Sequence, residues 1–169
     1  MVAVFEPDIH RITVSDYETL PNIERTELID GVIYDMSPES VVHANAVDAI
    51  YHRLRERHPA RIVRQAGSVR LDDTSLVEPD VYVAVRLPDD GYPDAADVDL
   101  IVEVALNTWA KDSGPKLAVY ARSGIATCWL VDPRPGGSLV RHGDPVDGAY
   151  RQVETVVLAD GLASLPVVI

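Results

Sequence analysis

The sequence is poor in cysteine and in long apolar runs. Its 169 residues include one cysteine, Cys128, which excludes an internal disulfide framework and favours a reducing compartment. No stretch reaches the ~20 apolar residues that a membrane helix needs. The first ten residues turn acidic too early for a secretory signal peptide. We therefore expect a soluble, cytoplasmic protein with no membrane contact.

Basic residues are also scarce. There are 15 against 27 acidic residues, and the net charge is −12. Proteins that coat nucleic acid through a broad surface are usually basic, so the composition argues against that class. The charge is uneven, because Arg53–Arg70 contains six arginines and one acid, whereas Asp72–Glu103 contains ten acids and one arginine. This arrangement suits a metal site that receives a phosphate backbone, and equally suits two solvated surfaces.

What is present is the composition of an ordinary globular protein. Hydrophobic residues make up 47% and charged residues 25% of the chain. A length of 169 residues fits one domain, residues 1–169, that buries its own core.

Local patterns predict a mixed α/β fold, with a central mixed sheet flanked by helices. The predicted helices are a short one opened by a capping box at 15–18, one from Ser40 or His43 to Pro59, and one over about 113–123. The predicted strands are two around a turn at Asp30-Gly31, a hairpin of 62–63 with 68–71, then 80–85, 99–106 and 127–131, and late edge strands at 139–141 and 150–157.

Glu103 is the most informative residue because it interrupts the apolar strand DLIVEVAL, residues 99–106. Burying an unpaired carboxylate costs several kcal/mol, so Glu103 needs a cation, a proton or a metal. Strand alternation places it on one face with Ile101 and Ala105. The alternative is a buried salt bridge to an arginine.

Asp80 is the second candidate, since it follows Pro79 at the start of a short strand. An aspartate there is often only a turn or cap residue. If its strand lies beside that of Glu103, the two carboxylates form an oxygen-rich site suited to Mg²⁺ or Mn²⁺. Zinc is disfavoured because Cys128 stands alone in an apolar strand.

Lys116 is the third candidate. The chain has only two lysines, Lys111 and Lys116, beside thirteen arginines. A lysine retained in such a sequence can place a compact ammonium beside a water molecule or a phosphate. Because Asp112 and Lys116 are spaced i, i+4, a surface ion pair between them is the alternative.

The order of these residues resembles a known family. The segments are ELIDGVIYDMSP (27–38), His43, EPD (78–80), IVEVA (101–105), D-x-x-x-K-x-x-x-Y (112–120) and CWLVDP (128–133). They are similar to the Uma-type putative restriction endonuclease family of the PD-(D/E)XK nuclease superfamily. The resemblance covers about residues 14–151 and rests on the order of the six segments.

The resemblance implies a restriction endonuclease-like core with an N-terminal β-hairpin extension. It implies a Mg²⁺- or Mn²⁺-dependent endonuclease that hydrolyses DNA phosphodiester bonds. Asp80, Glu103 and the Val104 carbonyl would hold the metal, and Lys116 would orient water or stabilise phosphate charge. By this resemblance, Lys116 would take the role that the superfamily usually gives to the position of Ala105.

The resemblance also places Glu27 and His43 at the catalytic site, with Tyr120 one helical turn after Lys116. Each has a simpler interpretation. Glu27 could be a surface residue at a strand entry, His43 a polar residue at a helix N-terminus, and Tyr120 a packed, half-buried aromatic.

One segment departs from the family pattern. Residues 106–109, Leu-Asn-Thr-Trp, replace a Ser-Pro-Ser-Thr-like stretch and are one residue shorter. This puts substrate fit in doubt and keeps two other functions open: a catalytically inactive nuclease-like scaffold that binds protein or nucleic acid, and a phosphodiesterase for small molecules. A homodimer is expected, because nucleases that cut both strands often pair two sites.

Overall fold

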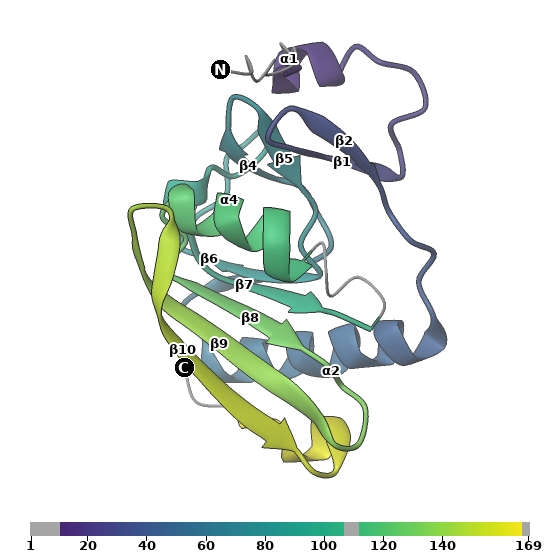
Figure 1. The fold of residues 1–169 in the computed structure, drawn as a ribbon, viewed down its shortest axis with the longest axis vertical. Helices are drawn as coiled ribbons and strands as arrows, with labels where there is room; N and C mark the ends of the chain where they lie inside the picture. The colour runs from purple at the N-terminus through teal and green to yellow at the C-terminus, as the bar shows by residue number, and fades with distance from the viewer. Residues whose placement is uncertain (1–10, 107–111, 167–169) are drawn as a thin grey trace, which may run out of the picture.

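The computed structural model describes residues 11–106 and 112–166, whose strands form two sheets (Figure 1). The strands are β1 Thr26–Ile29, β2 Val32–Asp35, β3 Ile62–Gln65, β4 Val69–Asp72, β5 Ser75–Val77, β6 Val81–Ala84, β7 Val98–Val104, β8 Thr127–Val131, β9 Gly137–Val146 and β10 Ala149–Leu158. The helices are α1 Val14–Tyr17, α2 Val41–Arg57 and α4 Leu117–Arg122; a π-helical turn, Asp112–Lys116, leads into α4, and 3₁₀ turns span Ala95–Asp97 and Gly161–Ser164.

The smaller sheet has the order β2-β1-β5-β4, and the larger sheet has the order β10-β9-β8-β7-β6-β3. In the larger sheet β7 and β8 are parallel, and the other neighbouring pairs are antiparallel. The predicted mixed sheet is therefore confirmed.

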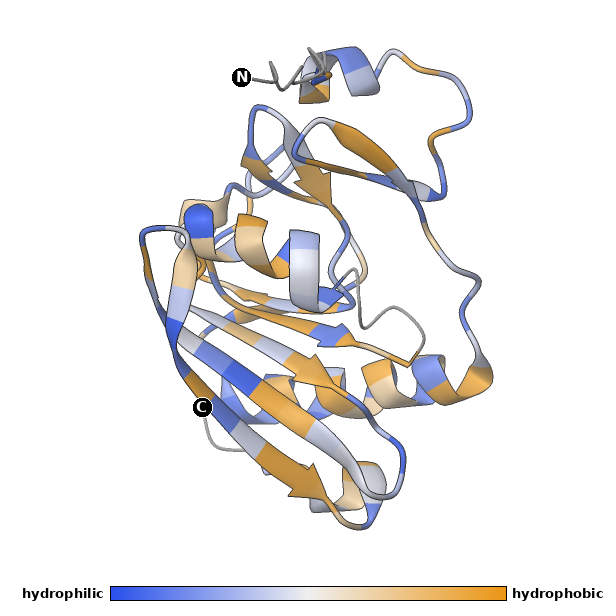
Figure 2. Ribbon diagram, in the orientation of Figure 1, coloured by the Kyte–Doolittle hydropathy of each residue, from blue (hydrophilic) through white to orange (hydrophobic). Residues whose placement is uncertain are grey.

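Two helices cover opposite faces of the larger sheet. Ile50 and Leu54 of α2 pack in one core cluster with Leu100 and Val102 of β7. The other face of β7 contributes Ile101 to a second cluster, which joins α4, β8 and the smaller sheet. Fully burying a side chain of this size contributes about 1.5–3 kcal/mol. This two-sided burial explains the nearly continuous apolar sequence of β7, which is mostly orange in Figure 2.

The N-terminal hairpin forms as predicted, with a tight turn at Asp30 and Gly31. Both turn residues have positive φ, 55° and 73°, as a two-residue type I′ hairpin turn requires. A Cβ on Gly31 would lie 2.4 Å from the Arg11 Cβ, so glycine is required there. The hairpin is part of the smaller sheet, because β1 pairs with β5 at Leu28 and Leu76.

Two local predictions were wrong. The capping box of α1 uses Thr13 and Asp16 instead of Ser15 and Glu18. Residues 62–63 and 68–71 do not form a hairpin with each other, because β3 pairs with β6 and β4 pairs with β5.

The start of α2 agrees with the prediction from Ser40. The Ser40 side chain accepts a hydrogen bond from the His43 backbone N–H, which caps the helix. This cap places His43 in the first turn of α2.

Sheet pairing brings the predicted site together. Val81 at the start of β6 lies opposite Val102 of β7, so Asp80 comes beside the end of β7 where Glu103 and Val104 lie. None of the helices within the described ranges is long and apolar enough to cross a membrane.

Candidate active site

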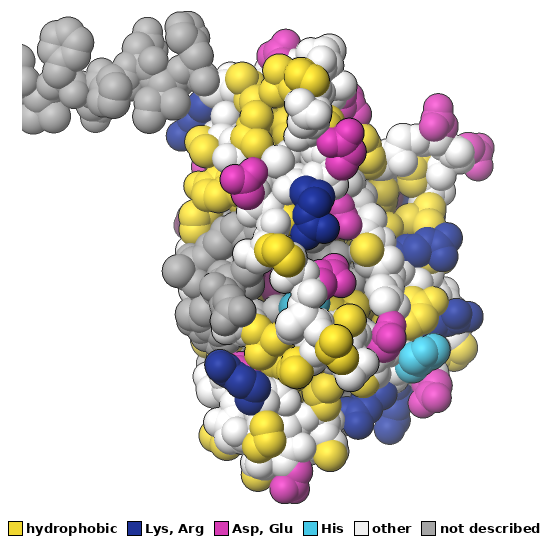
Figure 3. Space-filling view, turned by 90° about the vertical axis from the view of Figure 1, so that its right-hand side faces the viewer, with side chains coloured by type: hydrophobic (Ala, Val, Ile, Leu, Met, Phe, Trp, Pro, Cys, Tyr) yellow, Lys and Arg dark blue, Asp and Glu magenta, His cyan; other side chains and the backbone are white. Residues whose placement is uncertain are grey.

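The site is a small pocket at the end of β7, with a volume of about 90 Å³. Acidic and histidine side chains gather at the hollow on the face shown in Figure 3. The pocket is lined by Glu27, Met36, Ser37, Pro38, Glu39, Ser40, His43, Glu78, Asp80, Glu103, Val104, Leu106, Asp112 and Lys116. All five predicted catalytic residues therefore line one pocket.

A buried lysine between two carboxylates forms one wall. The Lys116 Nζ lies 2.7 Å from the Glu103 Oε1 and 2.7 Å from the Glu27 Oε1. All three residues are almost fully buried, at 1–3% exposure. Burial alone lowers the pKa of Lys116, but the carboxylates of Glu103 and Glu27 outweigh it and hold this pKa well above its ordinary value. Lys116 is therefore a fixed cation inside the pocket.

Tyr120 completes the contacts of Glu103. Its hydroxyl donates a hydrogen bond of 2.5 Å to the Glu103 Oε1. Burial, followed by the charge of Glu103, raises the pKa of Tyr120 well above its ordinary value, so the hydroxyl stays a donor. It lies in α4, one helical turn after Lys116, and both side chains contact Glu103.

Carboxylates outnumber cations around Glu103. Burial raises the pKa of Glu103 to about 8; Lys116 opposes this rise, while Asp80, Asp112 and Glu27 add to it. The pocket thus has more negative than positive groups and favours the uptake of a proton or another cation.

Asp80 lines the pocket from the residue before β6. Its Oδ2 accepts a hydrogen bond of 2.6 Å from the Val104 backbone N–H and lies 3.2 Å from the His43 Nε2. The hydrogen bond to Asp80 raises the pKa of His43, and burial opposes this. No hydrogen bond reaches the Asp80 Oδ1 from residues 11–106 or 112–166.

Sequence reasoning did not assign Glu78 and Asp112 to the site, although both lie in the quoted motifs. The Glu78 N–H donates to the Glu27 Oε1 at 2.9 Å, which explains why the EPD segment lies beside β1. Burial and then the charge of Glu27 raise the pKa of Glu78. Asp112 is buried at 3% exposure and adds negative charge near Lys116. Their acidic character within those motifs is the signal that could have identified them.

Several of the simpler interpretations are wrong. Glu103 is paired with a lysine and not with an arginine, Lys116 is not a surface residue, and Glu27 is buried. Tyr120 is fully buried. His43 is both a helix N-terminal residue and a partner of Asp80.

The donor set suits a hard divalent cation. Asp80 and Glu103 supply carboxylate oxygens, and Mg²⁺ commonly takes one or two carboxylates and keeps several waters. In the part of the chain that the structure describes, no three acidic, histidine or cysteine side chains form a complete metal cage. The contact that the structure gives Val104 is through its N–H, so its carbonyl as a ligand stays a prediction. The altered stretch continues over 107–109, outside the described residues.

Comparison with known proteins shows the family and the fold. The model of the Uma2 family, described as putative restriction endonuclease, matches residues 14–168. The fold is similar to the crystal structure of a putative nuclease belonging to DUF820 from Anabaena variabilis ATCC 29413, with a TM-score of 0.66 and 16% identity over 86% of this chain and 83% of that chain. Among curated proteins, no significant match was found. Because the family model matches nearly the whole chain, the chain belongs to the Uma2 family of putative restriction endonucleases.

Proposed function

We propose that the chain is a Mg²⁺- or Mn²⁺-dependent endodeoxyribonuclease with its reaction centre in this pocket. The observation that carries the proposal is that Asp80, just before β6, and Glu103 of the adjacent strand β7 line one pocket with a buried lysine, Lys116. Family membership supports nuclease activity. Metal dependence and the DNA substrate are the proposed parts.

Asp80 and Glu103 would hold the metal, with the Val104 carbonyl as a third ligand. The excess of carboxylates over cations supports this role. A divalent ion there supplies Lewis acidity to the scissile phosphate and lowers the pKa of a water molecule.

Lys116 would place positive charge where the phosphate gains negative charge. Its ion pairs with Glu27 and Glu103 keep the ammonium charged and fixed, so no reorganisation is needed during the reaction. Glu27 is then a positioning residue, because it acts on the substrate through Lys116.

His43 would act at the mouth of the pocket. Its side chain is 16% exposed, and Asp80 favours its protonated form. A protonated imidazole can donate a hydrogen bond to a phosphate oxygen or a proton to a leaving group.

The direct test is cleavage of plasmid and oligonucleotide DNA with Mn²⁺ by the wild type and by Asp80→Asn, Glu103→Gln and Lys116→Ala. We expect cleavage by the wild type and a loss of at least about 100-fold in each variant. Equal nicking by all four proteins would show contamination and refute the assignment.

A nuclease-like scaffold is the second candidate, and one observation favours it. The charges of the pocket are already partly satisfied internally, because Lys116 pairs with Glu103 while His43 and Val104 contact Asp80. Calorimetric titration with Mn²⁺ separates the two functions: the nuclease requires binding that is lost in Asp80→Asn and Glu103→Gln.

The proposal includes a homodimer. The ten-residue strand β10 lies at an edge of the larger sheet and exposes Val153 at 59% and Val157 at 67%. An edge strand with exposed valines is suited to pairing with a second copy. Sedimentation of the wild type and Val153→Asp tests this, with a monomer expected only for the variant.

A further inference from the structure

Arg25 lies beside the wall of the pocket formed by the segment between β2 and α2. Its guanidinium Nη2 donates a hydrogen bond of 3.2 Å to the carbonyl of Ser37, a residue that lines the pocket. Its backbone carbonyl accepts a hydrogen bond of 2.8 Å from the N–H of Met36, which lines the same wall. Two hydrogen bonds thus hold Arg25 against this wall of the pocket.

The charge of Arg25 is not neutralised by a carboxylate. No ion pair joins it to an acidic side chain of residues 11–106 or 112–166, and the side chain is exposed. Many other exposed arginines, such as Arg61 and Arg86, do have such a partner. An arginine left with unused donors is suited to binding an anion.

The chemistry of the pocket creates a need for such a cation. Six of its lining side chains are carboxylates, whereas Lys116 is already engaged by two of them. A chain of phosphates that approaches this pocket meets negative charge on most sides. A cation at the rim offsets that repulsion and orients the chain.

We infer that Arg25 binds a phosphate adjacent to the scissile one, so that the site selects a nucleic acid strand over a small phosphodiester. The guanidinium contacts the wall residue Ser37 and does not itself line the pocket, so it would meet a neighbouring phosphate and not the scissile one. This inference rests on the proposed nuclease function and names its substrate class.

The experiment compares two substrates that differ in neighbouring phosphates. One is a single-stranded DNA 12-mer, and the other is bis(4-nitrophenyl) phosphate, which has one phosphodiester and no neighbour. Arg25→Gln is expected to raise KM for the 12-mer about tenfold, leave kcat unchanged and leave both constants for the small diester unchanged. Arg25→Lys should recover part of the loss, because it keeps the charge and loses the planar fork.

The matched control is Arg57→Gln. Arg57 is exposed, has no ion pair within the described residues, does not line the pocket, and lies in the last turn of α2, at the end remote from Ser40 and His43. It should match the wild type on both substrates. Equal loss of activity on both substrates in Arg25→Gln would show that Arg25 merely supports the pocket wall, and would overturn the inference.

Binding without cleavage separates this inference from the proposed function. Fluorescence anisotropy with the labelled 12-mer in Ca²⁺, in the Glu103→Gln background, should give about tenfold weaker binding on adding Arg25→Gln and a slope of log K against log salt smaller by about 1. Unchanged affinity and slope, or no binding by either protein, would overturn the role of Arg25. Absence of cleavage by the wild type, with the Arg25-dependent binding intact, would overturn only the nuclease proposal.

Discussion

Ion pairs join helix α4 and the turn before it to the smaller sheet both inside the molecule and at its surface. Inside, Lys116 pairs with Glu27 of β1, and the two side chains are 3% and 1% exposed. At the surface, Arg122 pairs with Asp30 at the end of the same strand, and the two side chains are 45% and 34% exposed. The same two parts of the fold are thus linked by both buried and exposed ion pairs.

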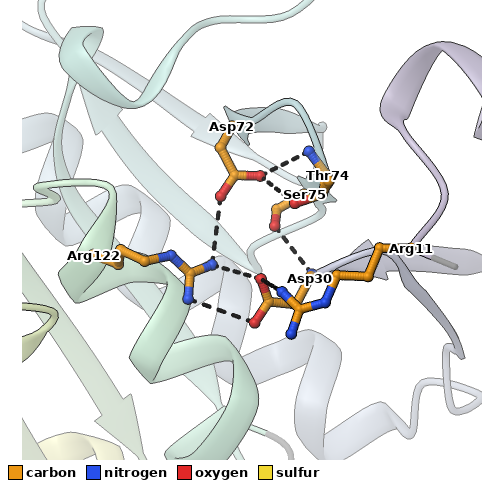
Figure 4. A network of polar contacts seen from close by, with 6 residues as sticks. All are labelled: Arg11, Asp30, Asp72, Thr74, Ser75 and Arg122. Atoms are coloured by element: carbon orange, nitrogen blue, oxygen red, sulfur yellow. Dashed lines mark hydrogen bonds and ion pairs between the residues drawn. The ribbon is translucent and has the colours of Figure 1, made fainter. Parts of the chain in front are cut away.

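The surface pair belongs to a network that Figure 4 shows from close by. Arg122 lies between Asp30, at 2.8 Å, and Asp72, at 3.5 Å. Asp30 also contacts Arg11, and its N–H donates to the Ser75 hydroxyl. This network fastens the hairpin turn to α4 through side chains that water can solvate.

The two pairs differ in what their loss costs. An exposed pair contributes about 0–1 kcal/mol, because water solvates either partner when the other is removed. Removing one partner of a buried pair lowers the free energy of unfolding by about 3–5 kcal/mol, because the remaining charge is neither paired nor solvated. The buried pair is therefore the costlier one to break, although both pairs link the same two parts of the fold.

The largest effect is expected for Lys116→Met. The substitution leaves the buried Glu27 carboxylate without its cation, and Glu103 too where it is ionised, above its pKa of about 8. The free energy of unfolding should therefore fall by about 3–5 kcal/mol at about pH 9, measured by urea denaturation. Adding Glu27→Gln and Glu103→Gln should recover most of this loss. A loss below about 1 kcal/mol in the single variant would contradict the buried charge.

The second effect is expected for Tyr120→Phe. This change removes the hydroxyl that donates to Glu103 and keeps the ring packing, so the free energy of unfolding should fall by about 1.5–3 kcal/mol. Urea denaturation measures it, with Tyr34→Phe as control, since the half-buried Tyr34 packs on the same core cluster and does not line the pocket. Equal small losses in both would mean that the contact with Glu103 contributes little.

The third effect concerns metal affinity and pH. Burial raises the pKa of Glu103 to about 8, so below pH 8 a metal ion must displace its proton. The apparent Mg²⁺ affinity should therefore rise about tenfold per pH unit up to about pH 8 and level off above it. Calorimetry from about pH 6.5 to 9 measures this rise, and Glu103→Gln should lack it. The same slope in that variant would assign the proton to another group.

The smallest effect is expected for Arg122→Gln. Both partners are partly exposed, so the free energy of unfolding should fall by less than about 1 kcal/mol, and the difference should shrink in about 1 M NaCl. Denaturation at low and high salt checks this. A loss as large as that of Lys116→Met would remove the distinction between the two pairs.

Features set by local sequence were predictable. The alternation of β7 correctly placed Glu103 on the face of Ile101, and Ser40 marked the start of α2. The partner of a strand is not a local property, which explains the wrong pairing of residues 62–63 with 68–71. The three-residue strand β5 was too short to give a periodic signal, and it is the partner of β4.

The sequence was enough to identify the residues of the site, but not the contacts between them. The order of the motifs along the chain was enough to group Asp80, Glu103 and Lys116 in one site. The contact of Lys116 with Glu27 joins residues far apart in the chain, and neither periodicity nor spacing encodes it. The burial of Asp112 and the role of Glu78 at Glu27 depend on the same long-range packing.

The most direct test of the account is a crystal of the protein soaked with Mn²⁺ and measured for anomalous scattering. We expect one strong peak between the carboxylates of Asp80 and Glu103, and its loss in crystals of Asp80→Asn. A wild-type crystal without a peak at that position, or with a peak that persists in Asp80→Asn, would contradict a metal-dependent centre in this pocket.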